Sequence, residues 1–407
     1  MESVIVVGGG LAGVRAVEAL RNQGFEGEVT LVSAERHRPY DRPPLSKAVL
    51  AGDRDDTTVE ADWEALRVRL LLGERATGLR PAPGGGGTLA TTAGDLDFDG
   101  LLIATGATPI TLPGDGPQHV LRTIGDALAL RERLTAGARV VIVGAGWIGA
   151  EVATAAAAKG CEVTVVEAAD TPLANAVGPE VGALTAPWYA AAGVTLRTGV
   201  KVAAVEPGGL LLAGGDRIEA DEVVTGVGVR PCVGWLEGSG LLVERGIVTD
   251  ASLRVTTEDA ARGGPGTVRP DIVAAGDCAA WWSGRYGRRL LVEHWDTALN
   301  APDVAVATLL GREAVYDAVP YFWSEQFGRM VQYAGHHPAA DRLLRRGDPA
   351  GDRWTVCWLA GDRLEAVLTV GRPRDLVQGR RAIAAGARVD PEALADPAVA
   401  VRDAVRS

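Results

Sequence analysis

Several features are missing from the sequence, and each absence excludes a class of protein. The 407 residues include only four cysteines, which are scattered and form neither a CxxC pair nor a cluster with metal-ligand spacing: Cys161, Cys232, Cys278 and Cys357. We therefore expect reduced thiols and no disulfide framework. His336 and His337 stand together in an expected turn without other ligands nearby, so no metal site is predicted.

Excess positive charge and a long apolar run are also missing. The formal net charge is −11, from 41 Lys and Arg against 52 Asp and Glu, whereas nucleic-acid binders need clustered positive charge. The longest uncharged run, residues 181–196, is interrupted by Gly182, Pro187 and Gly193, so no membrane span is predicted. The N-terminus has neither a basic leader nor a cleavage site. We expect a cytoplasmic protein without a nucleic-acid or membrane partner.

The sequence does contain one pattern that occurs twice. A β-branched run at 4–7 leads into a glycine turn at 8–13, a helical stretch with Val14, Val17 and Leu20, and a strand at 29–32. The second copy has a strand at 139–143, a glycine turn at 144–149, a helix at 151–159 and a strand at 163–166. This order of elements is typical of βαβ units that bind dinucleotides. Glycine- and proline-rich stretches at 81–87, 207–215 and 263–266 indicate exposed hairpin or linker segments.

Each glycine turn has the spacing Gly-x-Gly-x-x-Gly. The first glycine allows the sharp turn, the second lets backbone amides approach a pyrophosphate, and the third lets the helix and strand pack closely. An ordinary glycine loop is the alternative for one such motif, but two in the same context favour two dinucleotide sites. The predicted ligand-facing residues are Gly8, Gly10, Ala12 and Gly13 in the first turn and Gly144, Gly146, Trp147, Ile148 and Gly149 in the second. For Trp147, core packing is the preferred interpretation.

An acidic residue after the second strand of each unit is the expected ribose contact. Glu167 directly follows Val166, and no arginine occupies 168–170 to receive a 2′-phosphate, so the second unit is predicted to bind NADH rather than NADPH. A solvated strand-end carboxylate is the alternative. In the first unit the corresponding residue is Glu35, slightly displaced from the strand.

A strand ending in a lone acid identifies the flavin domain. Residues 272–277 end in Gly276-Asp277, and flavoproteins use such an aspartate to accept a hydrogen bond from the ribityl chain of FAD. With the strand at 101–106, which ends in Ala104, Thr105 and Gly106, it brackets the second unit. The first domain is therefore expected to be discontinuous and to bind FAD.

The predicted fold is α/β, with two Rossmann-like dinucleotide-binding domains and a C-terminal α+β domain. We expect an FAD domain at 1–112 and 247–316, an inserted NADH domain at 113–246, and a C-terminal domain at 317–407. The last shows short aromatic and β-branched runs at 321–323, 354–358 and 364–370, then a helix near 376–385.

The chain resembles, over essentially its whole length, the NADH-dependent ferredoxin reductases that serve Rieske-type oxygenases and bacterial cytochromes P450. Besides the two-dinucleotide plan, the resemblance rests on PYDRPPLSK at 39–47, LRT at 121–123, VEHW at 292–295 and YFWSEQF at 321–327. The first and last of these strings are specific to this family and its oxidase-like relatives such as apoptosis-inducing factor.

The resemblance implies particular cofactor contacts. Arg42, Lys47 and Arg122 would contact FAD, and Ala76 would supply backbone contacts near its adenine. Trp295 and Trp323 would line the flavin pocket. The turn of Gly226, Val227 and Gly228 matches the one that closes over the nicotinamide.

Lys47 and Glu151 are the candidate catalytic residues. Lys47 is one of only three lysines, in a loop that should reach the flavin, and a cation near the flavin N5–O4 edge favours electron arrival there. Glu151 lies where a nicotinamide would stack, so we predict that the two residues pair across the hydride path. A surface salt bridge is the alternative.

A helix is also expected within 293–310, with its N-terminal residues Glu293, His294, Trp295 and Ala298 at the flavin. Its first amides would stabilise negative charge on the reduced ring. Pro302 complicates this prediction, because a proline inside a helix costs about 3 kcal/mol, so the helix is expected to begin near it or to kink there.

The missing cysteines narrow the reaction. Residues 33–60 contain none, so a redox thiol relay of the kind found in disulfide reductases is not expected, and Cys278 is interpreted as an inert buried neighbour of the flavin. Electrons must then leave to an external acceptor, an iron–sulfur ferredoxin that feeds an oxygenase or cytochrome P450. Because ferredoxins are usually acidic, Arg285, Arg288 and Arg289 are candidate docking residues, with Arg312 or Arg329 in support. A solvated arginine run is the alternative.

The predicted function is therefore FAD-dependent NADH:ferredoxin oxidoreduction. Two alternatives stay open: a stand-alone NADH oxidase or small-molecule-reducing flavoenzyme, and a redox-responsive flavoprotein that acts through interactions.

Overall fold

The computed structural model describes residues 1–260 and 267–406. The loop expected at 263–266 and the terminal Ser407 lie outside the described residues. The chain forms two compact units. Unit 1 comprises residues 1–41, 58–108 and 230–320, and unit 2 comprises 42–57, 109–229 and 321–407. The chain passes from one unit to the other after residues 41, 57, 108, 229 and 320, and the third and fourth of these passages lie in β8 (Ala107–Pro109) and β16 (Val229–Pro231). The three-domain division predicted from the sequence has different boundaries from these two units and stays a prediction.

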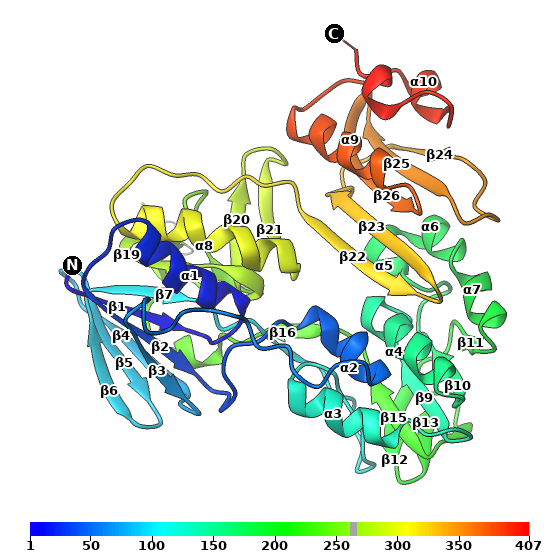
Figure 1. Ribbon diagram of the computed structural model, residues 1–407, viewed down its shortest axis with the longest axis horizontal. Helices are drawn as coiled ribbons and strands as arrows, with labels where there is room; N and C mark the ends of the chain where they lie inside the picture. The colour runs from blue at the N-terminus through cyan, green and yellow to red at the C-terminus, as the bar shows by residue number, and fades with distance from the viewer. Residues whose placement is uncertain (261–266, 407) are drawn as a thin grey trace. The chain divides into compact units, whose positions relative to one another are not determined.

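A six-stranded sheet forms the centre of unit 1, with the strand order β18-β19-β7-β1-β2-β3 (Figure 1). Its strands are β1 (Ser3–Val7), β2 (Glu28–Ser33), β3 (Val68–Leu72), β7 (Gly100–Ile103), β18 (Arg254–Thr256) and β19 (Val268–Ala274). All pair in parallel except β18, which runs antiparallel to β19. The three strands β1, β7 and β19 therefore end at the same edge of the sheet, where α/β sheets bind their ligands.

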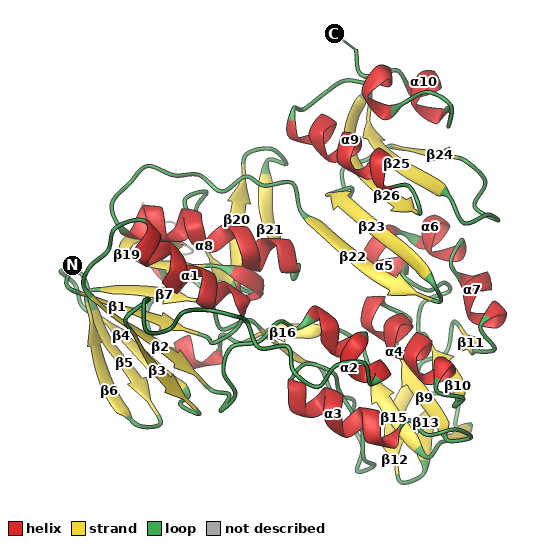
Figure 2. Ribbon diagram, viewed as in Figure 1, coloured by secondary structure: helices red, strands yellow, loops and turns green. Residues whose placement is uncertain are grey.

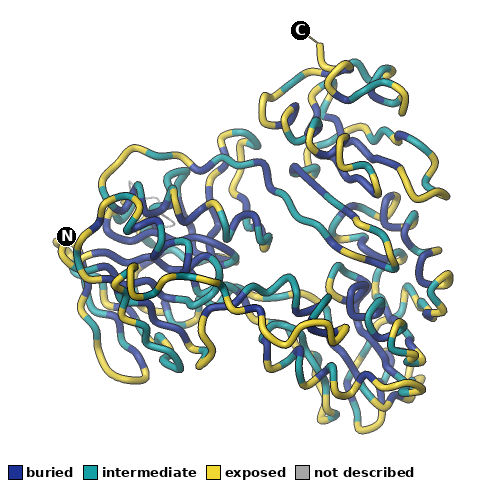
Figure 3. Tube along the Cα trace, viewed as in Figure 1, coloured by how far each residue is buried: buried dark blue, intermediate teal, exposed yellow. Residues whose placement is uncertain are grey.

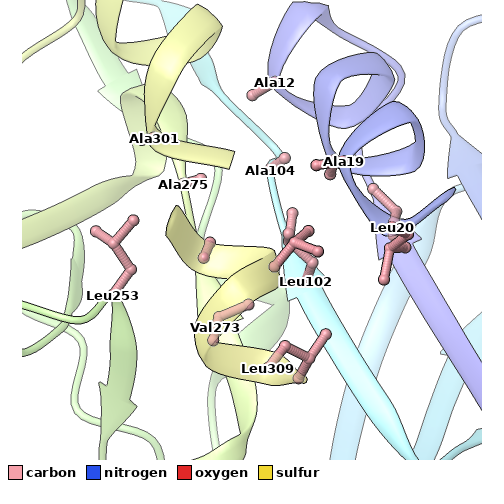
Figure 4. Packing of buried hydrophobic residues seen from close by; sticks show 14 of the residues in the cluster. Ala12, Ala19, Leu20, Leu102, Ala104, Leu253, Val273, Ala275, Ala301 and Leu309 are labelled. Carbon is pink, nitrogen blue, oxygen red and sulfur yellow. The ribbon is translucent and has the colours of Figure 1, made fainter. Parts of the chain in front are cut away.

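Helices α1 (Leu11–Asn22) and α8 (Trp295–Leu309) pack on this sheet. The apolar positions predicted for α1, Val14, Val17 and Leu20, are fully buried. Figure 4 shows small side chains such as Ala12 and Ala301 among larger ones, Leu102 and Leu309, in this cluster. Small residues allow close packing of the two helices with the sheet.

Two smaller sheets complete unit 1. One contains β4 (Ala76–Pro81), β5 (Gly87–Thr91) and β6 (Gly94–Phe98), and the other contains β17 (Ile247–Val248), β20 (Ala279–Ser283) and β21 (Arg288–Leu291).

Unit 2 contains a second parallel sheet, with the strand order β11-β10-β9-β15. Its strands are β9 (Arg139–Val143), β10 (Glu162–Val166), β11 (Thr195–Arg197) and β15 (Glu222–Thr225), and a small sheet of β12 (Val202–Glu206), β13 (Gly209–Leu212) and β14 (Arg217–Glu219) accompanies it. The helices of this part are α2 (Ala48–Ala51), α3 (Ile124–Arg133), α4 (Trp147–Ala158), α5 (Ala174–Val177), α6 (Pro179–Ala183) and α7 (Ala186–Ala191). Figure 3 shows the central strands of the two sheets, such as β1, β7 and β9, as buried.

The C-terminal part of unit 2 is an antiparallel sheet with the order β22-β23-β26-β25-β24. Its elements are β22 (Tyr321–Gln326), β23 (Arg329–Gly335), β24 (Arg342–Arg346), β25 (Trp354–Ala360), β26 (Arg363–Val370), α9 (Pro373–Ala384) and α10 (Pro391–Ala395). Figure 2 shows the change from alternating helices and strands to this strand-rich layer. Trp188 and Trp354 are both buried and pack in the same core cluster.

The structure corrects two predicted helix boundaries. Helix α4 begins at Trp147 rather than Glu151, because the turn ends at Gly146 and the third glycine already lies in the first helical turn. Helix α8 begins at Trp295 and has Pro302 in its interior, so the expectation of a start near Pro302 is wrong. Pro302 is buried beside buried Ala301 and Ala305, and this packing stabilises a helix through a residue that disfavours it.

Candidate dinucleotide sites and a buried ion-pair network

The first glycine turn has the three-part geometry predicted from its sequence. Gly8 has φ +122°, and a Cβ there would lie 2.1 Å from the carbonyl oxygen of Ala104. A Cβ on Gly13 would lie 1.9 Å from the oxygen of Gly8, so only glycine allows this contact of helix and turn. A Cβ on Gly10, in contrast, would meet no heavy atom of the described residues within 4 Å.

The second glycine turn repeats this geometry in unit 2. Gly144 has φ +103° and a Cβ there would lie 2.3 Å from the oxygen of Gly226, while a Cβ on Gly149 would lie 1.9 Å from the oxygen of Gly144. Gly146 is again open, with nothing in the described chain within 4 Å of its Cβ position. Gly226 thus lies directly against the turn, as expected for a residue of the same site.

Both turns fit the pyrophosphate of a dinucleotide. Gly10 is the N-cap of α1 and Gly146 the N-cap of α4, and no side chain of the described residues caps either helix. The amides of the first helical turn are therefore available to an anion, and the helix dipole favours negative charge at that position.

Glu167 is held at the second turn by two backbone amides. Its Oε2 accepts from the amide of Ala145 at 2.7 Å and its Oε1 from the amide of Ala169 at 2.8 Å. The carboxylate therefore has a fixed orientation beside the glycine turn. Its role as the ribose contact stays a prediction.

In unit 1, Glu35 follows β2 and accepts a hydrogen bond of 2.5 Å from the Tyr40 hydroxyl. The neighbouring Asp41 accepts from Trp295 Nε1 at 2.7 Å. The segment that begins the PYDRPPLSK string is thus attached through Asp41 to the first residue of α8. Sequence reasoning had not singled out Tyr40 and Asp41, although both belong to the PYDRPPLSK string.

Four further predicted flavin contacts of unit 1, Ala104, Thr105, Gly106 and Asp277, follow the carboxyl ends of two neighbouring strands of its sheet. Ala104, Thr105 and Gly106 follow β7, and the Thr105 hydroxyl donates to the Cys232 carbonyl at 2.8 Å. Gly276, beside Asp277, follows β19 at φ +78°, and a Cβ on it would lie 3.2 Å from Cβ of Ala12. Asp277 therefore follows a turn that lies against the first residues of α1.

The buried cysteines are unsuited to redox chemistry. Cys278 and Cys357 are fully buried, and burial raises the pKa of the Cys278 thiol to about 11 and that of Cys357 to about 12. At neutral pH both are thiols, whereas the thiolate is the reactive form. The predicted burial of Cys278 is confirmed, whereas its position beside the flavin stays a prediction.

The predicted pairing of Lys47 with Glu151 is confirmed within unit 2. Lys47 Nζ lies 2.8 Å from Glu151 Oε2, and the Glu151 side chain is only 3% exposed. The Ser46 hydroxyl also donates to Oε2, and the Ser324 hydroxyl donates to Oε1 at 2.6 Å. This burial and hydrogen bonding exclude the alternative of a surface salt bridge.

Ser46 and Ser324 were missed by sequence reasoning. Both lie in strings on which the family resemblance rests, PYDRPPLSK and YFWSEQF. Only the position of each beside a predicted residue, Lys47 and Trp323, could have pointed to them.

The other predicted site residues are placed as follows. The Arg42 side chain donates to the Arg122 carbonyl at 3.3 Å, and Trp147 packs edge-on against Phe322 with ring centroids 4.5 Å apart. Ile148 and Val227 are 43% and 37% exposed. The predicted NADH residues all lie in unit 2, whereas the predicted FAD residues are divided: Arg42, Lys47, Arg122 and Trp323 in unit 2, and Gly8, Gly10, Ala12, Gly13, Glu35, Ala76, Ala104, Thr105, Gly106, Asp277, Glu293, His294, Trp295 and Ala298 in unit 1.

The candidate docking arginines differ in their exposure and in the contacts that they already make within the protein. Arg288 and Arg289 are exposed on β21, and Arg289 Nη1 donates to the Thr249 carbonyl at 2.8 Å. The Arg285 amide donates to Asp317, and Arg312 is bonded to Gln23. Arg329 pairs with Asp352 and lies over the ring of Trp188, so its charge is already engaged in unit 2.

Over residues 1–260 and 267–406, no group of three or more His, Cys, Asp or Glu side chains is arranged to hold a metal ion. In the same ranges no helix has the length and apolar character needed to cross a bilayer.

Comparison with known proteins gives matches over nearly the whole chain. Residues 2–301 match the pyridine nucleotide-disulphide oxidoreductase family model, and residues 321–405 match the reductase C-terminal model. The chain is 38% identical to the ferredoxin–NAD(+) reductase component of the anthranilate 1,2-dioxygenase system of Burkholderia cepacia, over 98% of each protein. Among solved structures it is similar to Fdr9, with a TM-score of 0.92, 46% identity and coverage of 98% and 99%. It is also similar to putidaredoxin reductase in its covalent complex with putidaredoxin, with a TM-score of 0.91, 32% identity and coverage of 99% and 97%.

Proposed function

The chain belongs to the pyridine nucleotide-disulphide oxidoreductase family, and from that membership we propose that it is an FAD-dependent NADH:ferredoxin oxidoreductase. The single observation that carries the proposal is the pair of equivalent glycine turns, each open at its second glycine and each at an uncapped helix N-terminus. The similar reductase components, which match along the full chain, support the choice of a ferredoxin as the acceptor.

The first turn is proposed to hold FAD. The amides of α1 would bind its pyrophosphate, Glu35 its adenosine ribose and Asp277 its ribityl chain. When bound, FAD would supply the ability to take up two electrons as a hydride and to give them up one at a time. The partial positive charge at the N-terminus of α8 would stabilise negative charge on the reduced flavin ring.

The second turn is proposed to hold NADH. The amides of α4 would bind the pyrophosphate, and Glu167, already held by two backbone amides, would accept hydrogen bonds from the ribose. The turn 226–228 would cover the nicotinamide, and the Lys47–Glu151 pair would orient it for hydride transfer, which needs alignment more than proton exchange.

The electrons are proposed to leave directly to an iron–sulfur ferredoxin that serves an oxygenase or cytochrome P450. The buried thiols of Cys278 and Cys357 are poorly suited to carry them. Because the chain is itself acidic, docking of an acidic ferredoxin would use a local basic surface, and exposed Arg288 and Arg289 are proposed for it. We also propose the three-domain division given above and a cytoplasmic location.

Anaerobic reduction by NADH, followed by cytochrome c assays with and without added ferredoxin, tests the proposal. Ferredoxin-dependent turnover is expected. Rapid oxygen consumption without ferredoxin would instead indicate an NADH oxidase, and negligible turnover with a long-lived reduced protein would indicate a redox-responsive interaction protein.

A further inference from the structure

One face of α4 is attached to β22 and to the turn that follows it. Residues 147, 151 and 154 share this face, because positions three and four apart lie above one another on a helix. The three contacts are an edge-on packing of Trp147 with Phe322, a hydrogen bond between Ser324 Oγ and Glu151 Oε1 at 2.6 Å, and a hydrogen bond from the Phe327 amide to Thr154 Oγ1 at 3.0 Å. The middle contact is the one that reaches the ion pair.

The Ser324 hydroxyl has a defined direction. Ser324 is fully buried, and its Oγ accepts a hydrogen bond of 3.1 Å from Nε2 of Gln326, which is also fully buried. A serine hydroxyl has a single proton to donate. With Gln326 as its donor, that proton is directed to the Glu151 carboxylate.

The Glu151 carboxylate is held at both of its oxygen atoms. Lys47 and Ser46 donate to Oε2, whereas Ser324 and, at 3.3 Å, the Glu325 amide donate to Oε1. A carboxylate anchored at one oxygen can still rotate, and one anchored at both cannot. The donors from β22 therefore fix the plane of the Glu151 carboxylate and, with it, the position at which Oε2 contacts the Lys47 ammonium.

We propose that Ser324 is a positioning residue for hydride transfer, which sets the Glu151 carboxylate and, through it, the Lys47 ammonium. The inference rests on the proposed function and extends it, because it assigns part of the hydride-transfer site to the C-terminal sheet. A site held by supporting hydrogen bonds keeps its geometry during the reaction.

Ser324→Ala removes the bond to Glu151, and Thr154→Val is its matched control. Thr154 lies on the same face of α4 and bonds the same segment, but its hydroxyl is hydrogen-bonded to the Phe327 amide and the Ala150 carbonyl rather than to the Glu151 carboxylate. In stopped-flow experiments with saturating NADH we expect Ser324→Ala to slow flavin reduction about tenfold, the scale of one hydrogen bond to a charged group. The dissociation constant for NADH should stay within about twofold. Ser324→Thr, which keeps the hydroxyl, should restore the rate.

A second measurement does not depend on turnover. The chain has only three lysines, Lys47, Lys159 and Lys201, so the oxidised FAD-loaded protein labelled at lysine ¹³Cε should give three resonances. The resonance of Lys47 is identified by its loss in Lys47→Met. Ser324→Ala should move that resonance and leave the other two in place, and Thr154→Val should move none.

The proposal is overturned if Ser324→Ala and Thr154→Val give equal rates and an unmoved Lys47 resonance, since Ser324 would then only attach β22 to α4. Failure of the proposed function would look different, because the wild-type protein itself would not be bleached by NADH. Should Ser324→Ala fold poorly, Gln326→Met removes the amide that orients the hydroxyl. Like Ser324→Ala, this variant is expected to slow flavin reduction and to move the Lys47 resonance. An unchanged rate and an unmoved resonance would again contradict the proposal.

Discussion

The ammonium of Lys47 lies 2.8 Å from Oε2 of Glu151, and the carboxylate is 3% exposed. A loop residue and a helix residue 104 positions apart are thus joined in a site from which water is largely excluded. Low exposure strengthens their electrostatic interaction, and it makes each partner costly to lose alone.

Lys47→Met should slow reduction of the flavin by NADH about tenfold or more, with a smaller effect on NADH binding, because the cation is needed as electrons arrive. Stopped-flow absorbance at several NADH concentrations separates the two quantities. Lys159→Met is the control for loss of a lysine. Lys47→Met leaves the buried Glu151 carboxylate without its cation, which destabilises the protein. The double variant Lys47→Met/Glu151→Gln removes that unpaired charge. It therefore tests whether lost stability, rather than loss of the cation, slows flavin reduction. Wild-type rates in Lys47→Met would contradict the assignment.

Glu167→Gln should weaken NADH binding about tenfold and reduce the preference for NADH over NADPH. A carboxylate accepts hydrogen bonds from two ribose hydroxyls and repels a 2′-phosphate, whereas an amide does both less well. The measurement is kcat/KM for each coenzyme. Glu162 lies at the exposed start of β10, the strand that directly precedes Glu167. Glu162→Gln should therefore leave kcat/KM for both coenzymes unchanged. An unaltered coenzyme ratio in Glu167→Gln would show that the carboxylate serves only the turn.

Arg288→Glu should raise the apparent KM for ferredoxin several-fold at low salt, and the difference should shrink at high salt because screening weakens attraction between exposed charges. It is a cleaner variant than Arg289→Glu, which also removes a bond to the Thr249 carbonyl. Arg69→Glu on β3, also exposed, is the charge-matched control. Equal KM values for the two variants would exclude β21 as a docking face.

Stability should fall as the pH drops through about 6.5 because of His337. Burial lowers the pKa of this residue from its ordinary 6.5, and its ring stacks on Trp358 with centroids 4.8 Å apart. The unfolded chain then binds a proton at a pH where the folded protein does not, so stability is present above pH 6.5 and lost below it. Between pH 7.5 and 5.5 the unfolding temperature of His337→Phe should therefore fall less than that of the wild type. Parallel curves would contradict this account.

Much of the fold follows from local patterns. The β-branched runs, the glycine turns and the periodicity of Val14, Val17 and Leu20 specify the two βαβ units, because each local preference agrees with the tertiary structure. The start of α4 and the continuous α8 were harder to predict. A glycine in a first helical turn and a proline inside a helix are both locally unfavourable, and only tertiary packing makes them acceptable.

The candidate site was predictable to the extent that its residues carry a local signature. Glu167 has one, since it follows a strand at a characteristic distance from the turn. Ser46 and Ser324 have none: a serine accepts and donates in many settings, and what gives these two a role is their approach to Glu151 from distant segments. The Lys47–Glu151 pair was predicted because Lys47 is one of only three lysines in an arginine-rich chain.

The assignment of FAD to the first turn and NADH to the second is tested most directly by blocking each turn separately. Gly10 and Gly146 have ordinary negative φ values and open space around them, so Gly10→Glu and Gly146→Glu should fold while a carboxylate occupies the pyrophosphate position. The measurement is the visible spectrum of each purified variant before and after anaerobic addition of NADH, then of dithionite. We predict that Gly10→Glu is colourless, and that Gly146→Glu is yellow, is not bleached by NADH and is bleached by dithionite. A colourless Gly146→Glu with a yellow, NADH-reducible Gly10→Glu, or two variants that behave like the wild type, would contradict the account.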